Sequence, residues 1–121
     1  MSKLYEVLTP DFAFQDDRGE LVQLVHTGYE QVNVLVSRAG TVRGGHYHRR
    51  SREAFYVVRG SVTLTFRMEE RQEQRTFCAG AFFLIHPYVV HNMIFPEDCV
   101  LVGLYDRCVE GENGEKDIFT D

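Results

Sequence analysis

The chain contains 121 residues, of which 44% are hydrophobic and 26% charged, a globular composition that fits one domain and excludes a disordered chain. Its formal net charge of −5 excludes the basic face on which nucleic-acid binding depends. No run of residues approaches the roughly 18 apolar side chains of a membrane span, so neither nucleic acid nor a membrane is expected as a partner.

Short runs rich in apolar and β-branched residues, separated by turn signals, predict strands along the whole chain. Arg59-Gly60 is expected to turn a hairpin, and residues 68–75, though helix-like in composition, are interpreted as an exposed loop. No helix-strand alternation is present, so the pattern favours a small antiparallel all-β barrel. The expected strands cover residues 21–25, 32–37, 54–58, 61–66, 76–77, 81–85, 91–95 and 100–105.

The beginning of the chain and its cysteines bear on location. The first residues lack the long apolar run of a signal peptide. Cys78, Cys99 and Cys108 show no short paired spacing, and an odd number of cysteines favours free thiols in a reducing compartment. We therefore expect a cytoplasmic protein. The acidic residues of segment 110–121 are interpreted as a solvated tail.

Four residues have the types and spacing of a metal site. His46 and His48 are two positions apart in an extended segment, so both imidazoles point to one face. Glu53 follows after four residues, and His91 lies 43 residues beyond His48 in another strand-like run. Three imidazoles and a carboxylate suit borderline or hard divalent ions such as zinc, iron, manganese, nickel or cobalt. A barrel mouth can bring such residues together from different strands.

Residues 40–60 resemble the first sequence motif of the cupin superfamily, G-x5-H-x-H-x4-E-x6-G, without a mismatch. The second cupin motif, G-x5-P-x-G-x2-H-x3-N, is similar to residues 80–95 only in part. Gly80 and His91 match it, whereas His86, Tyr88 and Phe95 stand where Pro, Gly and Asn are usual. The two motifs span residues 40–95, about half of the chain.

This resemblance implies an all-β, single-domain cupin with a jelly-roll β-barrel covering residues 1–121, and a homodimer, which is frequent in the family. It also implies one divalent metal ion, with zinc favoured and iron, manganese or nickel as alternatives. The implied ligands are His46, His48, Glu53 and His91.

Two groups of cupins resemble the chain more closely. Residues 14–24, FQDDRGELVQL, are similar to the D-x-R-G-x-L opening of several cupins that act on nucleotide-linked sugars, and residues 43–48, RGGHYH, resemble R-G-x-H-x-H of the nucleotide-sugar 3,4-ketoisomerases. The second group is the C-terminal cupin of capsular polysaccharide reductase-epimerases, which keeps the metal carboxylate and binds zinc. The ketoisomerases usually carry Gln at the Glu53 position and work without metal, so Glu53 favours the metal-dependent group.

The resemblance implies an isomerase or epimerase that acts on a nucleotide-linked keto sugar in polysaccharide biosynthesis. Abstraction of a proton beside the keto group gives an enediolate, which a divalent ion can stabilise. Arg43 is the candidate for binding substrate phosphate. The candidate bases are His86, which ranks first, with Tyr47 and Tyr88; Tyr105 is a further candidate, and strand parity turns Tyr56 away.

Two other functions remain open on the sequence. One is an iron-dependent cupin dioxygenase acting on a small organic acid or thiol. The other is a non-catalytic cupin that binds a small ligand. The fold by itself does not choose among them, because cupins carry many activities on one scaffold.

Overall fold

In a computed structural model that describes residues 3–120, the chain forms twelve β-strands. The described residues contain no α-helix, and so none long and apolar enough to cross a membrane. The strands are β1 (Tyr5–Val7), β2 (Phe12–Asp16), β3 (Gly19–Gln23), β4 (Gln31–Ser37), β5 (Val42–Tyr47), β6 (Glu53–Arg59), β7 (Ser61–Met68), β8 (Arg71–Cys78), β9 (Phe82–Ile85), β10 (Val90–Ile94), β11 (Cys99–Tyr105) and β12 (Phe119–Thr120).

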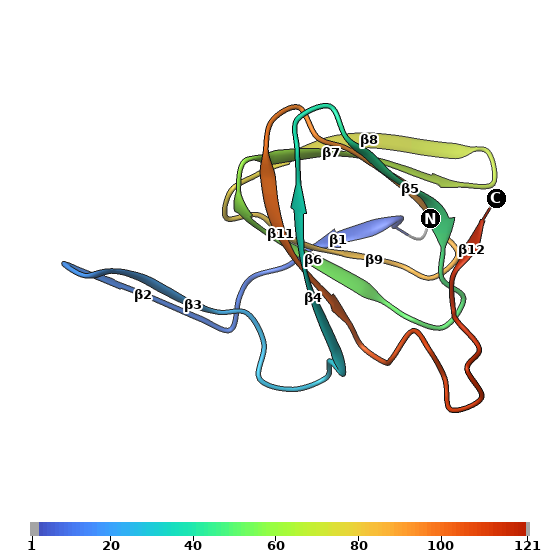
Figure 1. Ribbon diagram of the computed structural model, residues 1–121, viewed down its shortest axis with the longest axis horizontal. Helices are drawn as coiled ribbons and strands as arrows, with labels where there is room; N and C mark the ends of the chain where they lie inside the picture. Colours follow the sequence, from blue (N-terminus) through green and yellow to red (C-terminus); the bar gives the residue numbers. More distant parts are fainter. Residues whose placement is uncertain (1–2, 121) are drawn as a thin grey trace.

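Two five-stranded antiparallel sheets enclose the core (Figure 1). The first has the strand order β1-β9-β6-β11-β4 and the second β12-β5-β10-β7-β8. The chain passes from one sheet to the other between β5 and β6 and again between β6 and β7, as a jelly roll does. The predicted all-β jelly-roll barrel is thereby confirmed.

Alternation along the central strands directs large apolar side chains between the sheets. Phe55 on β6, Phe66 on β7 and Phe83 on β9 are each 1% exposed or less. Phe83 stacks on Phe77 of the other sheet with ring centroids 3.8 Å apart. Burial of each such ring contributes roughly 1.5–3 kcal/mol, so this core supplies a rigid frame for the strand ends that carry the site.

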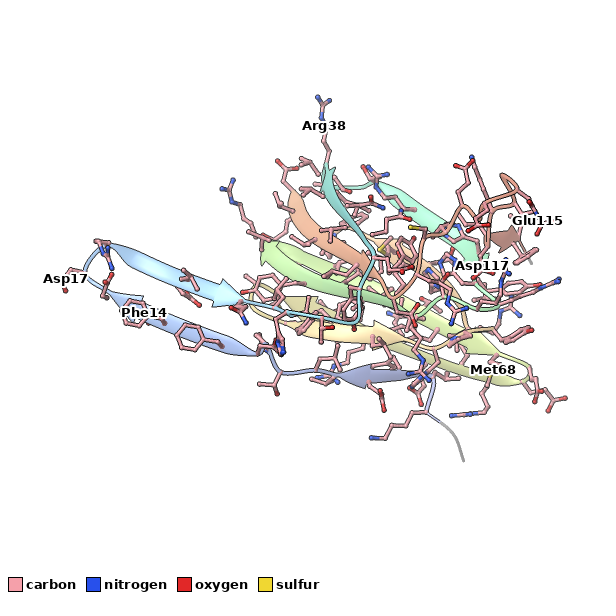
Figure 2. The ribbon with its side chains drawn as sticks, turned by 90° about the horizontal axis from the view of Figure 1, so that it is seen from below. Phe14, Asp17, Arg38, Met68, Glu115 and Asp117 are labelled. Atoms are coloured by element: carbon pink, nitrogen blue, oxygen red, sulfur yellow. The ribbon has the colours of Figure 1, made fainter. Side chains whose placement is uncertain are left out.

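The hairpin of β2 and β3 projects away from the two sheets (Figure 1). It contains the D-x-R-G-x-L segment, and Asp16 at its tip accepts hydrogen bonds from the backbone N–H and guanidinium of Arg18. Phe12, Phe14 and Leu21 are about half exposed, at 53%, 48% and 55%. Figure 2 shows Phe14 on this arm, well away from Asp117 at the other end of the molecule.

Two local expectations were wrong. Residues 71–75 are part of strand β8, which forms a hairpin with β7, and not of a loop. Because β8 is an edge strand facing solvent, polar side chains suit it. Gly60, with φ 83, links β6 to β7 in different sheets and does not turn a hairpin. A Cβ there would lie 2.1 Å from the carbonyl oxygen of Asp98, so the crossing requires glycine.

Candidate functional site

Three histidines from two neighbouring strands of the second sheet converge inside the barrel. His46 on β5 lies opposite His91 on β10, and His48 follows the end of β5. One ring nitrogen from each of the three histidines can be chosen so that all lie within 4.8 Å of one another. His48 and His91 are buried and His46 is half-buried. The structure therefore brings the three sequence-predicted imidazoles together.

Glu53, the first residue of β6, reaches the same cluster from the facing sheet. Its Oε1 atom lies 3.1 Å from His48 Nε2 and 3.3 Å from His91 Nε2. Burial would raise the pKa of this carboxyl, but its contacts with His48 and His91 outweigh burial and hold the pKa at about 2. Glu53 is therefore a carboxylate at neutral pH, although only 5% of it is exposed.

The environment shifts the pKa of His46 and that of His48 in opposite directions. Burial, aided by the neighbouring His91, lowers the pKa of His46. Burial also acts to lower the pKa of His48, but the hydrogen bond to Glu53 and the charge of that carboxylate raise it overall. The lowered pKa of His46 favours a neutral imidazole, which can bind a cation, whereas a cation bound at His48 would have to displace the proton that Glu53 favours there.

The donor geometry fits a divalent cation. His91 Nδ1 lies 3.1 Å from the Val89 carbonyl oxygen, to which it can donate, so Nε2 is left to face Glu53. Within the described residues, His91 Nε2 is buried and makes no well-aligned hydrogen bond, although Glu53 Oε1 lies 3.3 Å away. Buried polar atoms are rarely left in this state, and a metal bond would satisfy this nitrogen. The set His46, His48, Glu53 and His91 therefore fits one ion of the borderline class.

Gly44 allows the close approach of β5 to β10. It has φ +114, and a Cβ at this position would lie 2.5 Å from the His91 carbonyl oxygen and 2.9 Å from Asn92 Cα. The register of the two strands shifts between His91 and Asn92 at the same place. Gly44, two residues before His46, thus permits the strand pairing that brings His46 opposite His91.

Tyr105, at the end of β11, is the further candidate from the sequence that the structure places beside Glu53. It lies opposite Glu53 in the pairing of β11 with β6, and its ring meets that of His48 edge-on with centroids 5.3 Å apart. Burial raises the pKa of Tyr105 well above its usual range, and the charge of Glu53 and a hydrogen bond to it raise it further. The phenol therefore stays protonated. Parity from buried Leu101 along β11 could have indicated its inward direction.

The sequence-predicted catalytic residues have other surroundings. Tyr47 alternates with His46 and His48, and its ring stacks on Tyr88 and Phe119, at 6.2 Å and 5.6 Å between centroids. Tyr88 is 56% exposed. His86 Nε2 lies 3.9 Å from Glu6 Oε2, and both line a surface pocket. The geometry therefore does not favour these residues as the base: Tyr47 alternates with the ligand histidines, and His86 and Tyr88 lie in the loop between β9 and β10 with contacts outside the cluster.

Arg43, the predicted phosphate ligand, is exposed and makes hydrogen bonds to the end of β4. Its Nε donates to Ser37 Oγ at 2.9 Å, and a terminal nitrogen lies 3.4 Å from the Val36 carbonyl oxygen. These contacts tie β5 to β4 and leave only part of the guanidinium for a ligand.

The solvated-tail interpretation of segment 110–121 was wrong for Asp117, which is 2% exposed. Its carboxylate accepts hydrogen bonds from the loop that follows His48. No spacing motif marks this residue, because the contact joins positions nearly 70 residues apart.

Comparison with known proteins adds a family and a fold. A family model described as the polysaccharide biosynthesis C-terminal domain matches residues 14–94. The chain is 32% identical over 71 residues to the UDP-2-acetamido-2,6-beta-L-arabino-hexul-4-ose reductase of Pseudomonas aeruginosa. That match covers 58% of this chain, and the chain spans only 17% of the length of this curated relative.

Among solved structures, the sugar 3,4-ketoisomerase QdtA of Thermoanaerobacterium thermosaccharolyticum in complex with TDP has a TM-score of 0.82 and 18% identity, covering 100% of this chain and 90% of its own. The capsular polysaccharide assembling protein CapF of Staphylococcus aureus has a TM-score of 0.67 and 22% identity, covering 90% of this chain and 33% of its own. At such identities the likeness establishes the shared fold.

Proposed function

Because the chain belongs to the polysaccharide biosynthesis C-terminal domain family, we propose that it is an isomerase or epimerase acting on a nucleotide-linked keto sugar. Support comes from the proteins it resembles, which include a sugar 3,4-ketoisomerase bound to TDP and a reductase of a UDP-linked hexulose. The site geometry favours an enzyme that uses a metal ion over one that works without metal.

The observation that carries the proposal is the buried arrangement of three histidines around an ionised Glu53. Their ligand nitrogens come within 4.8 Å of one another, and Glu53 Oε1 lies 3.1 Å and 3.3 Å from two of them. Desolvating four such groups is costly unless they act on a charged partner. We infer that His46, His48, Glu53 and His91 hold one divalent ion, with zinc favoured by the donor types.

When bound, the ion would act as a Lewis acid for the negative oxygen that develops on the keto group. The protein's own groups then do the rest. Glu53 keeps its charge and orients His48 and His91. Tyr105 stays protonated, and its O–H, which is hydrogen-bonded to Glu53 in the absence of substrate, can turn to donate to the same developing oxyanion.

Proton abstraction beside a keto group makes a direct test possible. The full-length protein, loaded with zinc, is incubated in D₂O with TDP-4-keto-6-deoxyglucose and with a UDP-linked 4-keto sugar. NMR is used to detect deuterium at the carbon beside the carbonyl. We expect enzyme-dependent exchange that His48→Ala abolishes and that His26→Ala, which alters an exposed histidine elsewhere, leaves unchanged. Absence of exchange with a panel of keto-sugar nucleotides would contradict the proposal.

A further inference from the structure

The segment that follows β11 returns to the site. After Tyr105 the chain leaves the barrel, forms a small turn closed by the Glu110–Lys116 bridge, and comes back as β12 (Figure 1). β12 adds to the open edge of β5, where Thr120 pairs with His46 and Phe119 with Tyr47. This C-terminal strap, residues 106–120, therefore lies directly alongside the strand that carries the H-x-H motif.

The carboxylate of Asp117 organises the loop that follows His48. Its Oδ1 accepts the backbone N–H of Arg49 at 2.9 Å, and its Oδ2 accepts the backbone N–H groups of Arg50 at 2.9 Å and Ser51 at 2.8 Å. The Ser51 hydroxyl donates a fourth hydrogen bond at 2.8 Å. Successive N–H groups around one anion form a nest, so the loop is built around this side chain. These hydrogen bonds also hold the pKa of Asp117 at about 2, against the effect of burial.

The carbonyl of the same residue holds the imidazole of His48. The Asp117 carbonyl oxygen lies 2.6 Å from His48 Nδ1, which is buried and can only be the donor in this pair. With Nδ1–H donated to the strap, Nε2 is the nitrogen that faces Glu53, 3.1 Å away. A partner on the second nitrogen is the usual means of fixing the tautomer and ring orientation of a functional histidine.

We propose that Asp117 is the positioning residue for His48. Its carboxylate holds the loop that follows His48, and its carbonyl holds the imidazole ring. One residue therefore fixes both the backbone beside His48 and the orientation of its ring toward Glu53. The proposal rests on the proposed function only where it concerns the ion and the substrate; the orientation of His48 is a property of the protein alone.

The test compares Asp117→Ala and Asp117→Asn with a matched control, Asp106→Ala. The Asp106 carboxylate accepts a hydrogen bond from the backbone N–H of Arg52 at 2.9 Å. Removing that carboxylate therefore takes one hydrogen bond from the same loop without changing a contact of His48. The first readout is ¹⁵N NMR of the chelated full-length protein, which reports whether His48 Nδ1 carries a slowly exchanging proton. The second readout is the affinity for zinc alone.

We expect the slow Nδ1 proton of His48 in the wild type and in Asp106→Ala. We expect its loss in Asp117→Ala because, without the carboxylate that holds the strap against the loop, the backbone carbonyl of residue 117 moves away from Nδ1. Zinc affinity should fall by about 10–100-fold in Asp117→Ala, less in Asp117→Asn, which retains one acceptor oxygen, and remain unchanged in Asp106→Ala. If Asp117→Ala does not fold, the wild-type spectrum still decides, because a rapidly exchanging or unprotonated Nδ1 overturns the proposal. So does an unaltered His48 signal in a folded Asp117→Ala. A protected Nδ1 in a protein without sugar-isomerising activity would instead refute the proposed function alone.

Discussion

His46 and His91 lie directly opposite each other on the antiparallel strands β5 and β10, with ring centroids 5.3 Å apart. A shift of either strand by one residue would turn one ring to the opposite face. This pairing requires glycine at position 44, where a Cβ would lie 2.5 Å from the His91 carbonyl oxygen. The spacing of the histidines in the sequence therefore produces a metal site only because the pairing of β5 with β10 brings His46 and His91 together.

Gly44→Ala should damage the site by forcing β5 away from β10. The new Cβ would meet the His91 carbonyl oxygen at 2.5 Å, so roughly 1–3 kcal/mol of overpacking is added to roughly 1–2 kcal/mol of positive-φ strain. Gly40→Ala is the matched control, because Gly40 has φ +86 but nothing within 4 Å of its Cβ position. Urea unfolding should show a clearly larger loss for Gly44→Ala; equal losses would mean that the close approach is unimportant.

Removal of the metal ligands should abolish stabilisation by zinc. A ligand that binds only the folded state raises its stability, by about 2.7 kcal/mol at one hundred times the dissociation constant. We expect the melting temperature of the untagged wild type to fall on chelation, and Glu53→Ala and His91→Ala to lose most of that response. Elemental analysis should find near one equivalent of metal per chain. Equal zinc responses in all three proteins would refute the ligand assignment.

The sequence could predict the barrel and the ligand set because both depend on local patterns. Alternation identifies inward positions, and the H-x-H spacing places two imidazoles on one face regardless of the rest of the chain. The choice of base could not be corrected in this way, because all four residues of β9 are apolar and buried and His86 lies beyond the end of that strand.

Asp117 and the strap could not be recognised in the same way. Segment 110–121 is acidic, and an acidic run usually indicates a solvated surface. Burial of Asp117 depends on three backbone N–H groups of a loop far away in sequence, which become donors only once the barrel has formed. Such a tertiary contact leaves no periodicity or spacing to detect.

A homodimer is expected from the apolar surface that the chain leaves uncovered. Val32, Val34 and Val36 on edge strand β4 are 60%, 67% and 69% exposed, and the β2–β3 hairpin, which carries half-exposed Phe14, immediately precedes this strand. A two-stranded hairpin is marginally stable alone in water, so a second copy is the simplest cover for both features. Light scattering should give twice the 14.0 kDa mass of the chain, and Val34→Lys should shift it toward the monomer. A monomer at micromolar concentration in the wild type would contradict this expectation.

Tyr105→Phe should separate the site's chemistry from its packing. The change keeps the ring that meets His48 edge-on but removes the hydroxyl that is hydrogen-bonded to the buried Glu53 carboxylate, so we expect stability to fall by about 1.5–3 kcal/mol while the fold is kept. Loss of one donor to a developing oxyanion typically costs about 10²–10³ in rate, and deuterium exchange into the keto sugar should slow accordingly. Tyr47→Phe and His86→Ala serve as controls, since their side chains contact Phe119 and Glu6 outside the cluster. A normal rate in Tyr105→Phe together with loss of exchange in His86→Ala would contradict this prediction. The base would then be His86, and its side chain would have to turn from Glu6 toward the histidines when substrate binds.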